Sequence, residues 1–285
     1  MVQVEQEGLV SVASPVGGSG GGVEASSEAV RRLGRGVSRT GFASAARVLA
    51  VAGREVLAAF VSPIGYVVLV AFTLLTWVFG GSELLKSGTP ADLRQVLANA
   101  QTILIFTLPL VTMRLLSEEY RSGSIEGLMT APVSDFEVIL GKFLGTMSFL
   151  AVMLATTLIY PVLLLFIAEP MADYGEMAAG YVGLVLSSSM MVAVGVFFSA
   201  CTRHQLVAAL LTSGLLIVWY VFAQFLMREF EAGWVRSVLL YASGFGNFEG
   251  FLRGEVGYQP VIFFMSCMCL FLFAATKVLE SKRWR

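Results

Sequence analysis

The fold of this chain is decided by a stretch, Leu108 to Gly145, that reads LPLVTMRLLSEEYRSGSIEGLMTAPVSDFEVILGKFLG. It begins in an apolar block, passes through a connection dense in charged and turn-forming residues, and ends in a second apolar block. Long apolar blocks separated by short charged connections are typical of helices that cross a bilayer and of the loops that join them.

The same pattern repeats along the chain, which is 56% hydrophobic and only 14% charged. Six windows are free of charged residues and show no polar stripe, so they do not resemble half-exposed helices of a soluble protein. A helix needs about 20 residues to cross the hydrocarbon core. We therefore expect an all-α integral membrane protein with six transmembrane helices, at about 63–80, 96–114, 143–167, 178–201, 205–226 and 258–277.

Three further segments have their own patterns. Residues 1–42 are rich in glycine and serine and are expected to form a flexible cytoplasmic tail, whereas 43–285 form the membrane domain. Residues 43–60 group apolar and charged side chains as an amphipathic interfacial helix does. The apolar, glycine-punctuated segment 229–255 predicts a re-entrant segment before the sixth span.

The connection between spans two and three is expected to hold a short helix. Turn-forming runs at 122–124 and 130–132 leave a helical piece around 125–129, which exposes Glu126 and buries Leu128. Ser134 and Glu137 then form a capping-box pattern that opens span three. Without further information, this segment could equally be an ordinary charged loop.

The distribution of Lys and Arg predicts the orientation. With both termini cytoplasmic, most basic residues lie on the cytoplasmic side. The outside set is then Lys86, Arg94, Arg228, Arg236 and Arg253. The net charge of −1 does not indicate a nucleic-acid partner. We expect a multi-pass protein of the plasma membrane, in a bacterium the inner membrane, with the lipid bilayer as its surroundings.

The sequence lacks the motifs of several chemistries. It holds no glycine-rich phosphate loop, and Gly141-Lys142-Phe143 has neither the spacing nor the hydroxyl of one, so Lys142 is interpreted as an anchor on the cytoplasmic side. The six windows contain no ionisable Asp, Glu, Lys or Arg, which argues against proton coupling and for an external energy source. A sodium-coupled transporter stays open, because hydroxyls such as those of 187–189 can coordinate sodium. We expect no metal site and no catalytic residue.

The stretch from Leu108 to Gly145 resembles the signature region of type-2 ABC exporter permeases, nearest to the gliding-motility-associated and NosY-like group. In that family a Pro-x-x-Thr-Met-Arg run closes span two, followed by a Glu-Glu pair, a Gly-Thr-x-Glu step, an Ala-Pro-x-Ser turn and a Gly-Lys pair. The matching residues are Pro109, Thr112, Met113, Arg114, Glu118, Glu119, Gly123, Glu126, Ala131, Pro132, Ser134, Gly141 and Lys142. Ser124 stands where the family usually has Thr.

The resemblance implies a permease that is not itself an enzyme and binds no cofactor. ATP and magnesium would be held by a separate ABC ATP-binding subunit, and a second permease copy or a paralogue would complete a dimer. The ATPase contact implied by the resemblance is a cytoplasmic coupling helix with Glu118, Glu119, Arg121, Gly123, Ser124, Glu126 and Leu128. The alternatives are a membrane scaffold that anchors an ATPase without transport, a sodium-coupled transporter, and a passive channel. The apolar spans favour an amphipathic cargo as a hypothesis.

Overall fold

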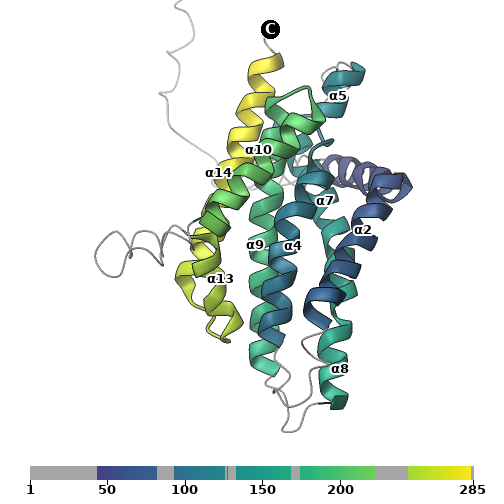
Figure 1. Cartoon of the computed structure of the whole chain (residues 1–285). Coiled ribbons are helices and arrows are strands. Elements are labelled where there is room, and N and C mark those ends of the chain that lie inside the picture. Colours follow the sequence, from purple (N-terminus) through teal and green to yellow (C-terminus); the bar gives the residue numbers. More distant parts are fainter. Residues whose placement is uncertain are drawn as a thin grey trace, which may run out of the picture. The chain divides into compact units, whose positions relative to one another are not determined.

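The computed structural model describes residues 44–81, 93–125, 127, 133–167, 174–222 and 243–283, and in these residues the regular structure is helical, without strands (Figure 1). The expected tail, 1–42, lies outside the described residues. The division of the chain into a tail and a membrane domain therefore stays a prediction.

The first described helix runs over residues 44–61, which confirms the helix expected at 43–60. After a break at Ser62, helix α2 (Pro63–Thr76) begins with proline in its first turn, where the missing N–H costs no hydrogen bond. It continues as a π-helical turn, η1 (Trp77–Gly81). Helix 44–61 and α2 run in different directions in Figure 1, and helix 44–61 packs against α7.

The second and third apolar blocks form α4 (Leu93–Thr112), α7 (Asp135–Thr157) and α8 (Ile159–Ile167), with the short helix α5 (Ser117–Ser122) in the connection. The capping box is confirmed, because the side chains of Ser134 and Glu137 each accept a hydrogen bond from the other residue's backbone N–H. The apolar block breaks at Leu158 because Pro161 has no N–H for the Thr157 carbonyl. The hydroxyl of Tyr181 donates to that carbonyl instead, at 2.9 Å.

Helix α9 (Tyr174–Cys201) is the centre of the bundle, and most of its membrane-length window is buried. Glycine allows the neighbouring helices to approach it closely: a Cβ at Gly195 would lie 2.1 Å from the Thr112 hydroxyl of α4, and one at Gly183 would lie 2.5 Å from Phe251. Around it are α10 (Gln205–Ile217) with its π-helical end η2 (Val218–Phe222), α13 (Gly244–Leu252) and α14 (Tyr258–Arg283).

Five of the described helical segments are long and apolar enough to cross a membrane. They are Pro63–Gly81, Leu93–Ser122, Asp135–Leu164, Tyr174–Cys201 and Tyr258–Lys282. The expected fifth span corresponds to a shorter apolar helix, Gln205–Tyr220, and its last part lies outside the described residues. The multi-pass architecture is therefore shown, while the count of six spans stays a prediction.

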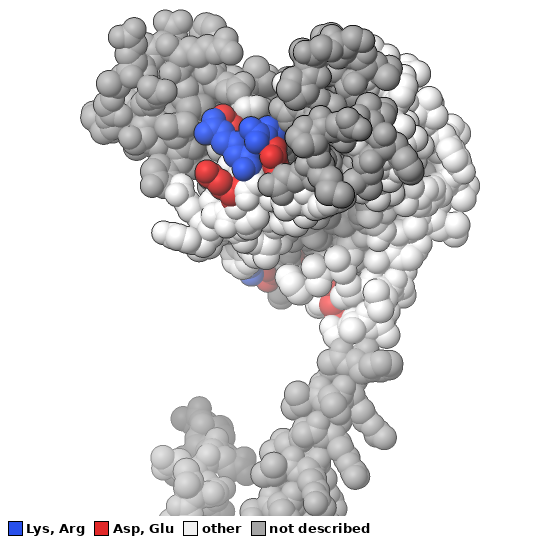
Figure 2. All heavy atoms as spheres, turned by 90° about the horizontal axis from the view of Figure 1, so that it is seen from below, with Lys and Arg blue, Asp and Glu red and all other residues white. Residues whose placement is uncertain are grey.

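At the bundle end opposite α5, the described charges are few. Figure 2 shows this face, where basic and acidic side chains lie next to each other in one group. The guanidinium of Arg94 on α4 pairs with Glu176 on α9, and Arg253 pairs with Glu249 within α13. Gly254, with φ 80°, turns the chain from α13 towards α14 directly against Glu176. Helix α13 thus lies beside the first turns of α9, and whether it enters the bilayer as a re-entrant segment stays a prediction.

Candidate functional site

Helix α5 brings the charged connection to one end of the bundle, where it meets helix 44–61 and the last turns of α14 (Figure 1). One face of α5 is exposed and carries Glu118 and Arg121, while Ser117 and Glu119 are buried. Gly123 ends the helix with φ 75°, a left-handed conformation that glycine adopts without steric cost. Helix α5 therefore has two different sides. Its exposed side carries charged residues, and its buried side contacts other helices.

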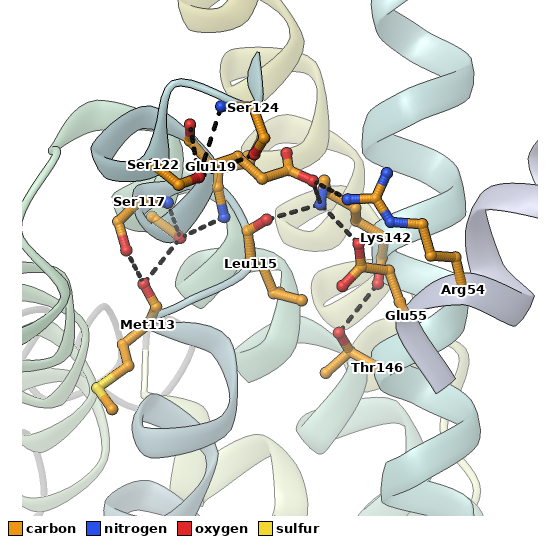
Figure 3. A network of polar contacts seen from close by, with 12 residues as sticks. Arg54, Glu55, Met113, Leu115, Ser117, Glu119, Ser122, Ser124, Lys142 and Thr146 are labelled. Atoms are coloured by element: carbon orange, nitrogen blue, oxygen red, sulfur yellow. Dashed lines mark hydrogen bonds and ion pairs between the residues drawn. The ribbon is translucent and has the colours of Figure 1, made fainter. Parts of the chain in front are cut away.

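The buried side of α5 is joined to two other helices by the ammonium group of Lys142 (Figure 3). Its Nζ donates to Glu55 Oε1 of helix 44–61 at 2.7 Å, to the Leu115 carbonyl at 2.7 Å, and to Glu119 Oε1 of α5 at 2.9 Å. Arg54 of helix 44–61 also donates to Glu119 Oε1, at 2.9 Å. All three donors of the ammonium group thus have an acceptor, each from a different part of the chain.

Lys142 is only 1% exposed, so it is not a solvent-exposed surface residue, while its expected position on the cytoplasmic side stays a prediction. A buried charge is tolerated only when it is paired and hydrogen-bonded, and two carboxylates and a carbonyl supply that here. Because Arg54 adds a second positive charge to the two carboxylates, the four ionised groups balance. The cluster of Arg54, Glu55, Glu119 and Lys142 is called the Lys142 network below.

The N-terminus of α5 is held by a residue of α9. The Ser199 hydroxyl accepts from the backbone N–H groups of Leu116, at 3.0 Å, and Ser117, at 3.2 Å, and donates to the Met113 carbonyl at 3.0 Å. Leu116 stands at the N-cap position and has no side chain that could do this. A serine from a distant helix therefore caps α5, and it fixes the first turn of α5 to the centre of the bundle.

A third connection runs from α5 to the end of α14. The Lys282 ammonium group lies 4.0 Å from the centroid of the Tyr120 ring and donates to the Ala200 carbonyl at 2.7 Å. It therefore combines a cation–π contact with hydrogen bonding to the free carbonyls at the C-terminus of α9, where a positive charge is favourable. Helix α5 is thus bonded to α7, α9, α14 and helix 44–61.

Helix 44–61 is joined to the start of α7 by a second ion pair. Arg47 donates from Nη2 to Glu137 Oε1 at 2.7 Å and from Nε to Oε2 at 3.1 Å, and the hydrogen bond to this carboxylate raises the pKa of Arg47. Glycines at 141 and 145 let the two helices touch: a Cβ at Gly145 would lie 2.6 Å from Glu55 Cβ and 2.9 Å from the Ala52 carbonyl oxygen. The bidentate pair and this close approach fix helix 44–61 across α7.

The structure divides the expected contact residues into two groups. Glu118, Arg121, Gly123 and Ser124 are exposed, so a partner can reach them. Glu119 is buried in the Lys142 network, while Glu126 and Leu128 lie outside the described residues. Of the helical piece expected at 125–129, residues 125 and 127 are described and are helical. Contact with an ATPase is not tested by these positions and stays a prediction.

Several residues that build this site were not recognised from the sequence. They are Arg54, Glu55, Lys142, Ser199 and Lys282. A signal was available for Lys142, because a lysine within an apolar block, one residue after glycine, is a poor surface position. Ser199 and Lys282 lie far along the chain from α5, and no local pattern marks them as its partners.

The described residues contain no group of His, Cys, Asp or Glu that could hold a metal ion. The site consists of a short helix at one end of a bundle of membrane-length helices, with charged residues on its exposed side and hydrogen bonds on its buried side. These features are those of a multi-pass membrane protein with an exposed charged helix at one end of its bundle.

A family model described as ABC-2 family transporter protein matches residues 49–233, which is more than half of the chain. The chain therefore belongs to the ABC-2 family of transporter proteins and is a permease, the membrane component of an ABC transporter. Such permeases normally work with an ABC ATP-binding subunit and carry no ATPase motif of their own. No curated protein matches the chain.

Proposed function

We propose that this chain is the permease subunit of an ATP-driven exporter, and that a separate ATP-binding subunit docks on the exposed face of α5. In this proposal α5 and both termini are cytoplasmic, the bilayer is the plasma membrane, and a second permease copy or a paralogue completes the transporter. The nearest group, gliding-motility-associated and NosY-like, rests on the sequence resemblance alone.

The proposal is supported mainly by the contacts that the inward side of α5 makes with neighbouring helices. Its exposed residues are free to meet a partner, whereas Ser117, Glu119 and Tyr120 on its other side contact three membrane-length helices, α9, α7 and α14. A displacement of α5 must therefore move these helices or break buried hydrogen bonds. An ordinary loop would absorb the same displacement by bending, because nothing would fix its backbone to the helices.

The two acidic neighbours in α5 then have different roles. Glu118 is exposed and can contact the ATP-binding subunit, together with Arg121 on the same helix. Glu119 acts as a positioning residue, because its carboxylate holds α5 to Lys142 and Arg54. Charge reversal at the exposed positions should weaken docking, whereas loss of Glu119 should leave docking intact and loosen the connection to the spans.

The experiment is a pull-down of the tagged full chain from its native membranes, with identification of the co-purifying proteins and an assay of ATP hydrolysis. The test variant is Arg121→Glu on the exposed side of α5. The control is Arg253→Glu, an exposed arginine of α13 near the opposite end of the bundle. We expect a stoichiometric ATPase with the wild type and the control, and at least a several-fold loss with Arg121→Glu.

The alternatives give different results in the same experiment. If Arg121→Glu retains the ATPase as fully as the control, the proposed docking face is wrong. Purification of the chain without any ATPase, together with sodium-dependent uptake, would instead favour the sodium-coupled transporter. Capture of an ATPase by a chain that moves no molecule would favour a membrane scaffold, because docking alone does not demonstrate transport.

A further inference from the structure

A groove of about 350 Å³ lies between α2 with its π-helical end η1 and helix α4. It is lined by Leu75, Phe79, Asn99, Thr102, Ile103 and Phe106, and its lining is mostly apolar. Phe79 and Phe106 are each more than half exposed. Both walls belong to segments that are long and apolar enough to cross a membrane, so the groove is expected to lie at membrane depth.

The π-helical turn η1 shapes one wall of the groove. The Trp77 ring stacks on Tyr160 of α8, with centroids 6.2 Å apart, and holds one side of the turn. On the other side, the Asn99 amide donates to the Phe79 carbonyl at 2.8 Å. A π-turn leaves backbone carbonyls displaced from regular helical pairing, and such turns often mark functional sites. Asn99 therefore fixes the turn whose Phe79 side chain forms the wall.

The exposed face of α4 changes character along the groove. Gln95, Asn99 and Thr102 are polar and lie in the first half of the helix, whereas Phe106 and Leu110 continue the same face as apolar residues. From residue 95 to residue 106 the helix rises by about 17 Å. The groove thus runs beside a polar section near the start of α4 and ends in an apolar section nearer its middle.

The polar residues that line the groove, Asn99 and Thr102, carry no formal charge. The Gln95 amide group donates to Asn99 Oδ1 at 3.2 Å, and the Thr102 hydroxyl donates to the Ala98 carbonyl at 3.0 Å. The Asn99 amide group has two N–H donors and uses one of them on the Phe79 carbonyl, while the Thr102 oxygen keeps lone pairs for a guest. A charged headgroup would lack a counter-ion among the lining residues, so a neutral group that can both donate and accept hydrogen bonds is favoured.

We propose that this groove binds one neutral amphipathic molecule whose hydroxyl-bearing head lies beside Asn99 and Thr102 and whose alkyl chain lies against Ile103 and Phe106. The inference rests on the proposed function, because the bound molecule is taken to be the cargo of the exporter. The volume lies at the lower end of the range for small-molecule pockets, which fits a single chain.

The test uses the purified full chain in phosphatidylcholine nanodiscs and a monoacylglycerol that carries a diazirine in its acyl chain. After illumination, the labelled peptides are mapped by mass spectrometry. Leu75→Trp fills the groove, and Leu74→Trp is the matched control, because Leu74 is 59% exposed on the same helix but does not line the groove. We expect labelling of α4 peptides to fall about tenfold with Leu75→Trp, a loss of about 1.4 kcal/mol in binding, and to stay near the wild-type level with Leu74→Trp.

A second probe tests which headgroup the groove prefers. A second assay tests whether the bound molecule is the cargo of the transporter. The same acyl chain with a phosphate head should label α4 several-fold less than the monoacylglycerol. In the complete complex with its ATPase, the monoacylglycerol should raise ATP hydrolysis, and Leu75→Trp should remove this increase. Equal labelling by both heads, or equal effects of the two tryptophan variants, would overturn the site.

The two proposals fail separately. Labelling needs no ATPase, so a chain that binds the probe but captures no ATPase would overturn the proposed function and leave the groove in place. Labelling without any increase in ATP hydrolysis would overturn the cargo role, because a resident bilayer lipid binds without being transported. If the probe does not label the chain, the groove proposal is wrong, but the proposed docking of an ATPase on α5 is not affected.

Discussion

Replacement of Lys142 by methionine tests the buried network most directly. The change keeps the length of the side chain and removes three hydrogen bonds of 2.7, 2.7 and 2.9 Å. It leaves the Glu55 carboxylate without this partner, while Glu119 keeps Arg54. Removing one partner of a buried ion pair costs about 3–5 kcal/mol, which for a chain of this size lowers the melting temperature by about 10 °C.

The assay is thermal unfolding of the full chain in detergent, followed by the loss of monodisperse protein on size-exclusion chromatography. Lys277→Met is the control, because Lys277 is exposed and its 2.7 Å pair with Glu280 lies on the surface of one helix. Such surface pairs contribute only about 0.2–1 kcal/mol. Equal melting temperatures for Lys142→Met and Lys277→Met would refute the reasoning that the network is buried and intact.

A double-mutant cycle with Glu119→Gln then measures the pair itself. Once Lys142 is gone, the Glu119 carboxylate has lost one of its two cationic partners, so its neutralisation should cost less than in the wild type. Residues in direct contact typically show coupling energies of about 0.5–3 kcal/mol. If the two changes are additive within error, the 2.9 Å contact between them does not contribute to stability.

Three further changes have definite expected outcomes in the same unfolding assay. Gly145→Ala should destabilise by about 1–3 kcal/mol through overpacking, because its Cβ would lie 2.9 Å from the Ala52 carbonyl oxygen. Ser199→Ala removes the acceptor for the first amides of α5 and should cost about 1 kcal/mol, with a matching rise in amide exchange over α5. Tyr181→Phe leaves the Thr157 carbonyl without its donor beside the break in the third block, and it should cost about 1–3 kcal/mol.

Each of these changes has a matched control elsewhere in the chain. Gly53 lies on the open side of helix 44–61, where a Cβ meets nothing within 4 Å, so Gly53→Ala should stabilise by up to about 1 kcal/mol through helix propensity. Ser266→Ala and Tyr258→Phe change exposed residues of α14 and should be neutral. A stabilising effect of Gly145→Ala would contradict the close packing of helix 44–61 on α7.

The helices were predictable from the sequence because their signals are local. Pro63 begins α2, the Ser134 capping box opens α7, and five of the six charge-free windows correspond to long apolar helices. The boundaries were less exact: α7 begins at Asp135, well before the expected start of span three, because nothing in a helix requires its first turns to be apolar. The end of the fifth window lies outside the described residues.

The contacts behind α5 were not predictable because they join residues far apart in the sequence. The exposed residues Glu118 and Arg121 follow from local charge, but the burial of Glu119 beside them depends on Lys142 and Arg54 from two other helices. A sequence pattern places adjacent residues on different faces of a helix, yet it does not say which face another element covers.

The hydrogen-bonded ion pairs between α5 and its neighbouring helices are better suited to transmitting movement than apolar packing would be. Apolar contacts depend on buried area and are non-directional, so two apolar surfaces can slide past each other at little cost. The Lys142 ammonium group instead bonds to the Leu115 carbonyl just before α5 and to Glu119 within it, at 2.7 and 2.9 Å, and a shift of α5 by one ångström would stretch or break these two bonds. Because an unpaired buried charge is costly, the helices that supply these groups are expected to move together with α5 when a partner displaces it.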